Sequence, residues 1–161
     1  MISKTIQSTA KVPVRSMLSQ LLAAEQQVSS LISKMMDAVW SVELRKTLRT
    51  ALAMSQEHQK RLLANCDFHE SRSDRNRLEK LESQIRAVID TGQRGSSKDL
   101  FLARLAMKMV RYKMLRYEDA LNGGCVGAMK DTRMLGGALS DEVAASLFLQ
   151  EHAERLLIRQ K

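Results

Sequence analysis

The sequence has few of the residues that interrupt helices and few of those that build β architectures. Its 161 residues include one proline and seven glycines, and aromatic residues make up 4% of the chain. So few breakers argue against a many-turned β fold, and the ten methionines suit flexible packing between helices. With 44% apolar residues and a length typical of one core, the chain is expected to be all-α.

Cysteines and long apolar runs are also scarce. Cys66 and Cys125 are too few for a disulfide framework, which favours reduced thiols and a cytoplasmic location. No apolar run approaches the roughly 20 residues of a membrane-spanning helix, so no membrane insertion is expected. Residues 1–12 are predicted to be a frayed basic lead-in, and residues 13–161 a single domain. The net charge of +8 is compatible with nucleic acid, anionic membranes or acidic proteins and selects none of them.

Capping residues and apolar spacing predict four long helices and one short helix. Pro13 suits the first turn of a helix ending near Trp40, and Ser41 suits the N-cap of a second helix ending near Cys66. A short helix containing Leu78 and Ile89 follows. This order of elements predicts a four-helix bundle with a long connection between the second and third long helices.

The two remaining long helices follow glycine-containing segments. Ser96 and Asp99 form a weak capping box, which predicts a helix from about Lys98 to Leu121. Glycines at positions 136 and 137 argue against a continuous helix there. Ser140, followed by two acids, is therefore predicted to be the N-cap of the last helix.

Ionisable groups interrupt the apolar seams of three long helices, where residues step by three and four. The first seam contains Leu18, Leu21, Glu25, Val28, Ile32, Met35 and Val39. The second contains Leu44, Leu48, Ala51, Ser55, His58 and Leu62. The seam of the last helix is predicted to contain Ala144, Leu147, Glu151, Glu154 and Ile158. These seams predict that acids and one imidazole face the interior of the bundle.

Buried carboxylates need partners, so these groups are expected to meet. In helical bundles, inward acids and histidines hold iron or manganese, usually with a Glu-x-x-His pair in one helix. No histidine here has glutamate three residues before it. One hypothesis is a single iron, manganese or zinc ion held by Glu25, His58, Glu151 and Glu154. The other is a metal-free polar cluster satisfied by Lys113, Tyr112 or Tyr117.

Three segments resemble the ferritin-like stress proteins of the YciE/YciF group: residues 21–27 (LLAAEQQ), 58–62 (HQKRL) and 112–117 (YKMLRY). The resemblance implies a four-helix bundle with a short extra helix, a bacterial source and dimeric association. It also implies a carboxylate-rich di-metal centre, to which Glu25 and His58 correspond.

This chain departs from the family pattern at the implied metal centre. Ala53, Met54 and Ser55 stand where the pattern looks like Glu-Glu-Thr, and residues 110–113 (VRYK) where it looks like Glu-His-Tyr-Glu. Lys113 would then replace a ligand, because a protonated amine cannot bind a divalent metal and neutralises nearby acids. The resemblance thus implies a degenerate member in which Lys113 pairs with Glu25 and a glutamate of the last helix.

Two further groups of residues have the composition of binding sites. Arg104, Lys108 and Arg111 share one helix face, which could bind nucleic acid without sequence preference or could be a solvated or dimer-facing surface. Phe101, Tyr112 and Tyr117 are expected in or near the core, which leaves few aromatics to stack on bases. Cys66 and His69 lack the further ligands that a zinc site requires.

The sequence therefore favours a protein that is not an enzyme. It has no glycine-rich phosphate loop and no convincing nucleophilic series, and no small-molecule substrate can be identified. The leading prediction is a stress-related, non-catalytic protein that associates as a homodimer. The alternatives are a metal-binding protein or weak oxidase, and a basic bundle that coats nucleic acid.

Overall fold

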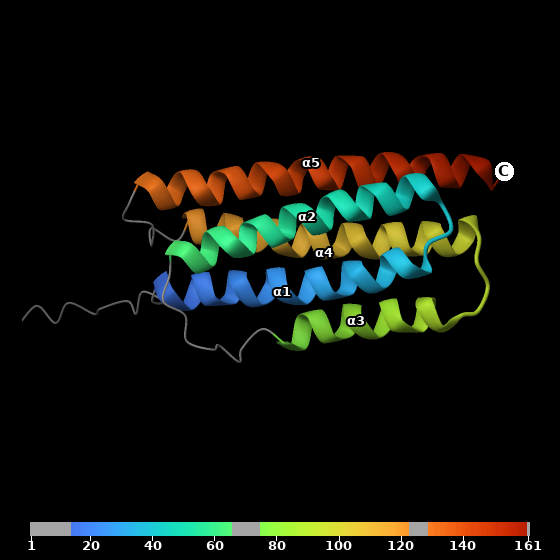
Figure 1. Ribbon diagram of the computed structural model, residues 1–161, viewed down its shortest axis with the longest axis horizontal. Coiled ribbons are helices and arrows are strands. Elements are labelled where there is room, and N and C mark those ends of the chain that lie inside the picture. The colour runs from blue at the N-terminus through green and yellow to red at the C-terminus, as the bar shows by residue number, and fades with distance from the viewer. Residues whose placement is uncertain (1–13, 66–74, 123–128, 161) are drawn as a thin grey trace, which may run out of the picture.

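The computed structural model describes residues 14–65, 75–122 and 129–160, and this part of the chain forms helices and no strands (Figure 1). The helices are α1 (Val14–Ala38), α2 (Val42–Asn65), α3 (Arg75–Asp90), α4 (Ser96–Asn122) and α5 (Met129–Arg159). The predicted lead-in and the Cys66–His69 pair lie outside the described residues. None of the described helices is long and apolar enough to cross a membrane.

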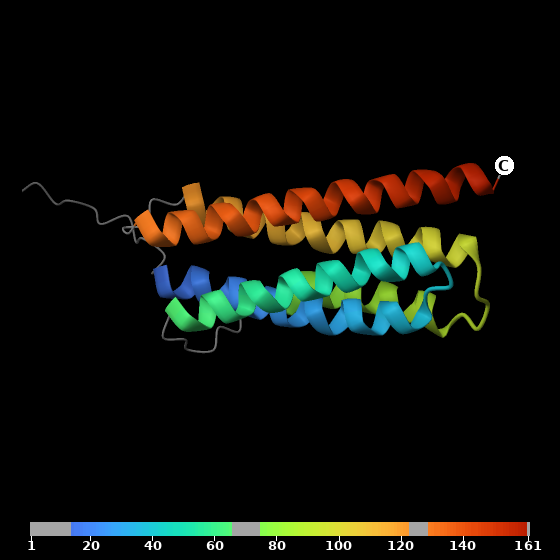
Figure 2. The same cartoon turned by 45° about the horizontal axis from the view of Figure 1, so that its top comes forward.

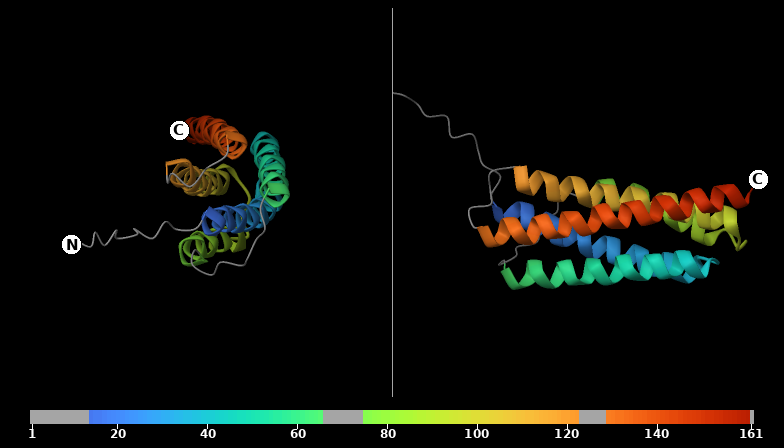
Figure 3. Two further views of the ribbon diagram at one scale, coloured as in Figure 1. Left: turned by 90° about the vertical axis from the view of Figure 1, so that its left-hand side faces the viewer. Right: turned by 90° about the horizontal axis from the view of Figure 1, so that it is seen from above.

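The four long helices form two antiparallel hairpins that lie against each other. α1 pairs with α2 and α4 with α5, while α1 also contacts α4 and α2 contacts α5. α3 returns the chain along the outside of α1 and α4, so that α2 and α4 run in the same direction (Figures 1 and 2). The end-on view in Figure 3 shows α3 outside the four long helices. The predicted four-helix bundle with a long connection and a short extra helix is confirmed.

The apolar seams predicted for the first two helices are buried throughout. Every seam residue of α1 and α2 is buried, including the polar residues Glu25, Ser55 and His58. In α3, Leu78 and Ile85 are buried and Leu81 and Ile89 half-buried, so one apolar stripe holds α3 against the bundle. The three-and-four stepping thus identified the inward faces of these helices.

The predicted start of the last helix is wrong. α5 begins at Met129 and continues through Gly136 and Gly137, and the Ser140 hydroxyl donates to the Gly136 carbonyl at 3.1 Å. Ser140 is therefore an interior residue of α5 and not its N-cap. The inward face of α5 consists of Leu135, Ala138, Glu142, Ala145, Leu149 and Leu156.

The predicted capping box at the start of α4 is also wrong. The Asp99 carboxylate accepts the backbone N–H groups of Trp40 and Ser41, at 2.9 and 2.6 Å. Gly95 occupies the N-cap position of α4, since its carbonyl accepts the Asp99 N–H at 3.1 Å. The predicted N-cap of α2 is confirmed, because the Ser41 hydroxyl accepts the Leu44 N–H at 3.2 Å. Asp99 thus fixes the α1–α2 turn to the end of the second hairpin.

Candidate functional site

Four ionisable side chains, one from each long helix, meet inside the bundle. They are Glu25 of α1, His58 of α2, Lys113 of α4 and Glu142 of α5, and each is at most 2% exposed. Each lies on the inward face of an amphipathic helix, so the apolar seams that build the core also bring these groups together.

Lys113 lies between the two buried carboxylates. Its Nζ donates to Glu142 Oε1 at 2.5 Å and to Glu25 Oε2 at 3.1 Å. The ammonium therefore links helices α1, α4 and α5 at one point. This contact confirms the implied pairing of Lys113 with Glu25 and an acid of the last helix, and the acid is Glu142.

Neutral side chains complete the environment of Glu25. The Tyr117 hydroxyl donates to Glu25 Oε1 at 2.6 Å, and the Ser55 hydroxyl contacts Glu25 Oε2. The expectation that Tyr117 satisfies the cluster is confirmed. Tyr112 does not take part: its buried hydroxyl has no hydrogen-bond partner in the described part of the chain, and its ring faces the Arg116 guanidinium at 5.2 Å. Both Glu25 oxygens thus have donors within the cluster.

His58 has a carboxylate beside each ring nitrogen. Nδ1 lies 3.1 Å from Glu25 Oε1 and 3.4 Å from Glu142 Oε1, and Nε2 lies 3.0 Å from Asp141 Oδ2. Burial alone would lower the pKa of His58, but hydrogen bonds to Glu142, Glu25 and Asp141 outweigh it and raise the pKa to about 10. The ring is therefore an imidazolium that donates from both nitrogens at neutral pH.

The pKa values of Glu25, Lys113 and Tyr117 are also shifted, in directions that balance the charges within the cluster. Burial opposes ionisation of Glu25, yet the contacts with His58, Lys113, Ser55 and Tyr117 lower its pKa to about 2. Burial also opposes the charge on Lys113, but Glu25 and Glu142 raise its pKa above the usual value. Burial and the nearby Glu25 raise the pKa of Tyr117, which stays a neutral donor. Two carboxylates and two cations thus make the buried part of the cluster electrically neutral.

Two predicted site residues lie elsewhere. Glu151 and Glu154 are exposed, so the prediction that they face the interior with Glu25 is wrong. Glu151 forms an ion pair with Arg155, and Glu154 accepts a hydrogen bond from Gln150 at 3.1 Å. Sequence reasoning missed Glu142 because it was assigned to the first turn of a helix starting at Ser140. The continuing three-and-four series of Leu135, Ala138, Glu142, Ala145 and Leu149 could have identified it.

Three members of the cluster have the chemistry of metal ligands. Glu25, His58 and Glu142 can each offer one ligand atom, and these atoms all lie within 4.8 Å of one another. Two carboxylates and an imidazole suit iron, manganese or zinc. However, Lys113 Nζ already contacts both carboxylates, and a protonated imidazole has no lone pair to donate. A metal would therefore have to displace the ammonium and a proton from His58.

The predicted basic face of α4 lies on the surface. Arg104, Lys108 and Arg111 are all exposed, and none of them forms an ion pair with a described residue. Phe101 is also exposed, at 57%, so its predicted place in the core is wrong. Tyr117 is buried as expected.

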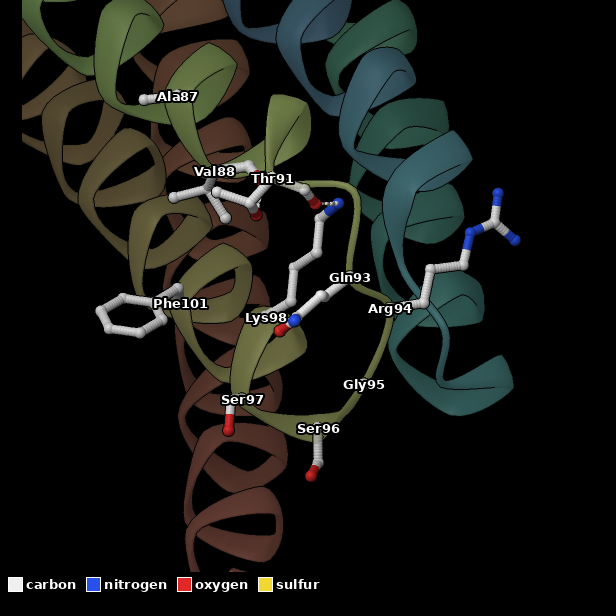
Figure 4. Close-up of a pocket in the computed structure, with 10 residues that line it drawn as sticks. All are labelled: Ala87, Val88, Thr91, Gln93, Arg94, Gly95, Ser96, Ser97, Lys98 and Phe101. Atoms are coloured by element: carbon white, nitrogen blue, oxygen red, sulfur yellow. Dashed lines mark hydrogen bonds between the residues drawn. The ribbon is translucent and has the colours of Figure 1, made fainter.

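A surface cleft of about 660 Å³ at the junction of α3 and α4 provides a second possible site (Figure 4). Its Lys98 reaches back to the carbonyls of Ile89 and Thr91, at 2.9 Å each, while Arg94 points away from the cleft (Figure 4). No carboxylate, imidazole or thiol lines it. The hydroxyls of Thr91, Ser96 and Ser97 therefore have no carboxylate or imidazole in this lining that could act as their general base.

Residues 15–161 match the family described as "Domain of unknown function (DUF892)". The chain belongs to this family. As a member of the DUF892 family it is similar in structure to the E. coli stress protein YciF, with a TM-score of 0.79 and 19% sequence identity. The likeness covers 89% of this chain and 94% of that one. Among proteins of curated function, none matches this chain.

The comparisons confirm the resemblance to the YciE/YciF group and the predicted all-α bundle. At 19% identity, the likeness to YciF carries information about the fold alone. The chemistry of this DUF892 member therefore has to be argued from its own interior cluster.

Proposed function

We propose that this protein is a stress-related, non-catalytic helical bundle that associates as a homodimer and does not depend on a metal. The observation that carries the metal-independent part is the position of Lys113, whose ammonium contacts Glu25 and Glu142 from within the bundle. A fixed cation there supplies the positive charge that two buried carboxylates require. The stress-related role rests on the structural likeness to the stress protein YciF.

The closed state of the cluster supports a non-catalytic role. Glu25, His58, Lys113 and Glu142 are nearly inaccessible, and the small pocket beside His58 and Tyr117 has no room for a water-sized molecule. A catalytic acid or base needs a substrate within hydrogen-bond reach. The charged groups here bind one another instead.

Metal analysis of purified protein tests this function. We expect far less than one equivalent of iron, manganese or zinc per chain, and no rise in melting temperature when Mn²⁺ or Zn²⁺ is added. The variant Lys113→Glu removes the ammonium and adds a carboxylate beside Glu25, His58 and Glu142, so it is expected to gain metal binding and stabilisation by metal. Lys60→Glu, on the exposed side of α2, is the matched control and should gain neither.

Metal binding by the native chain is the alternative function, favoured by the close approach of Glu25, His58 and Glu142. Stoichiometric metal in the wild-type protein that disappears in a Glu25→Ala, Glu142→Ala variant would establish it. Such a result would overturn the metal-independent role, and a weak oxidase activity would then have to be tested.

Nucleic-acid binding is a further alternative, favoured by the exposure of Arg104, Lys108 and Arg111 without ion pairs in the described chain. It predicts retention of DNA at low salt that is lost as salt rises, because phosphate contacts release counterions. Neutralising the three cations should abolish the retention. Absence of retention at low salt would exclude this function.

A further inference from the structure

α5 has a second stripe of spaced residues on its outer side. Val143, Leu147, Glu151, Glu154 and Ile158 are all exposed and lie opposite the inward Glu142. Leu147 and Ile158 are 62% and 70% exposed. Three of the ten large hydrophobic residues exposed in the described chain share this stripe: Val143, Leu147 and Ile158. Such a concentration on one helix indicates a contact surface.

The neighbouring helix carries the opposite charge on its outer side. Arg104, Lys108 and Arg111 lie on the side of α4 opposite Lys113, and none has an ion-pair partner in the described chain. Among the described residues, the polar partners of the stripe's acids belong to α5 itself: Arg155 pairs with Glu151, and Gln150 donates to Glu154. One exposed hairpin thus presents a basic stripe and an acidic, apolar stripe side by side.

Two contacts fix the register of this hairpin. Lys113 Nζ bonds Glu142, and Gln160 Nε2 donates to the Ser97 hydroxyl at 3.2 Å near the other end. Between these contacts, Arg104 lies at the level of residues 151–153 along the bundle. Arg104 is therefore at the same height as the acids of α5, while Lys108 and Arg111 are level with residues 147–149 and 144–146.

We propose that the two stripes bind each other in a homodimer, with α4 of each copy lying against α5 of the second copy. The assignment rests on the proposed association function and names the surface that performs it. A two-fold axis parallel to the bundle keeps every residue at its own height, so Arg104 of one copy faces Glu151 and Glu154 of the other. An axis perpendicular to the helices would place α4 on α4 and bring like charges together, which is unfavourable.

The size of the face suits a stable dimer. Helices of 27 and 31 residues are about 40 and 46 Å long at 1.5 Å per residue, so they lie side by side over about 40 Å. Two such helices side by side are roughly 20 Å wide, which gives on the order of 800 Å² per copy, the size of a typical stable interface. The apolar residues Leu147 and Ile158 would supply the buried area, and the charges would select the pairing.

Reciprocal charge reversal followed by sedimentation equilibrium tests the surface. We expect the wild type to be dimeric. Two double variants should each weaken self-association about tenfold or more: one combines Arg104→Glu with Lys108→Glu, and the other combines Glu151→Lys with Glu154→Lys. Mixing the two variants in equal amounts should restore dimers, because both contacts of the mixed pair are then complementary. The control Lys46→Glu, Arg49→Glu alters exposed cations of α2 and should stay dimeric. Leu147→Asp should also weaken the dimer.

The outcomes separate this surface from the proposed function. A monomeric wild type would overturn both. A dimeric wild type whose reversal variants remain dimeric would overturn the surface alone. Variants that are monomeric, helical by circular dichroism and unable to form mixed dimers would overturn the α4-to-α5 pairing.

Discussion

Lys113 determines the charge balance of the interior at the scale of single residues. Without the Lys113 ammonium, the carboxylates of Glu25 and Glu142 repel each other, and His58 is the remaining buried cation of the cluster. We expect Lys113→Met to lower the free energy of unfolding by about 3–5 kcal/mol, as when one partner of a buried ion pair is lost. Urea unfolding followed by circular dichroism measures it.

A matched change on the surface shows whether burial is the cause. Lys60→Met replaces an exposed lysine of α2 and should alter the free energy of unfolding by less than about 0.5 kcal/mol. A loss below about 1 kcal/mol in Lys113→Met would mean that the ammonium does not hold the two carboxylates together.

The pKa of Glu25 predicts how the free energy of unfolding falls at low pH, the acid limb of the stability profile. The folded pKa of about 2 lies below the ordinary value of 4.5, so the folded state favours the ionised carboxylate. This contribution is fully present above pH 4.5 and is lost as pH falls towards 2. In Glu25→Gln, the free energy of unfolding should therefore depend less on pH between 4.5 and 2. An acid limb as steep as that of the wild type would contradict the assignment.

His58 predicts the opposite behaviour on the alkaline side. Its folded pKa of about 10 lies above the ordinary value of 6.5, so folding favours the protonated ring. The contribution is complete below pH 6.5 and is lost as pH rises through 10, by at most about 1.4 kcal/mol per pH unit. Chemical unfolding at several pH values measures it, and NMR of the imidazole protons gives the pKa directly. A ring that titrates near 6.5 in the folded protein would exclude the imidazolium.

At the scale of elements, Asp99 joins the start of α2 to the start of α4. Its buried carboxylate is the acceptor for the N–H groups of Trp40 and Ser41. Asp99→Ala leaves both donors without this partner and should lower the free energy of unfolding by about 2–4 kcal/mol. Ser41→Ala removes only the N-cap hydroxyl and should cost about 1 kcal/mol. Equal losses in the two variants would contradict the linking role of Asp99.

The glycine pair of α5 provides a stabilising change. Gly136 and Gly137 lie inside the helix, and a Cβ added at either position would meet no atom within 4 Å. Each Gly→Ala substitution should therefore raise the free energy of unfolding by about 0.5–1 kcal/mol, because alanine restricts the unfolded chain and favours helix. Gly92→Ala, outside the helices, is the comparison. Destabilisation by Gly136→Ala would contradict a continuous α5 with open space at this position.

These same glycines explain which part of the site the sequence could predict. Glu25 and His58 stand in unbroken seams, so the apolar residues on both sides fixed their inward direction. In α5, the glycine pair and the Ser-Asp-Glu segment have the sequence pattern of a helix N-terminus. The inward face defined by Leu135 and Ala138 was therefore not extended to Glu142. The outer stripe also has the spacing of a seam, and spacing alone cannot distinguish a core face from a surface face.

At the scale of the whole molecule, the helices do not depend equally on the core. α1, α2, α4 and α5 each contribute to the interior cluster, whereas α3 lies outside and, over residues 78–90, fully buries only Leu78 and Ile85. A segment with few buried apolar contacts opens at a lower free energy than the global unfolding. α3 should therefore exchange its amide hydrogens through an opening that leaves Glu25, His58, Lys113 and Glu142 in contact.

Native-state hydrogen exchange with residue resolution tests this order of stability. We expect the amides of α3 to exchange faster than those around Lys113 in α4, and Ile85→Ala to accelerate α3 further while leaving the α4 amides nearly unchanged. The reason is that the cavity left by Ile85→Ala lies between α3 and the bundle and leaves the ion-pair cluster intact. Equal protection of α3 and α4, with equal loss in the variant, would mean that the extra helix and the four-helix bundle unfold as one cooperative unit.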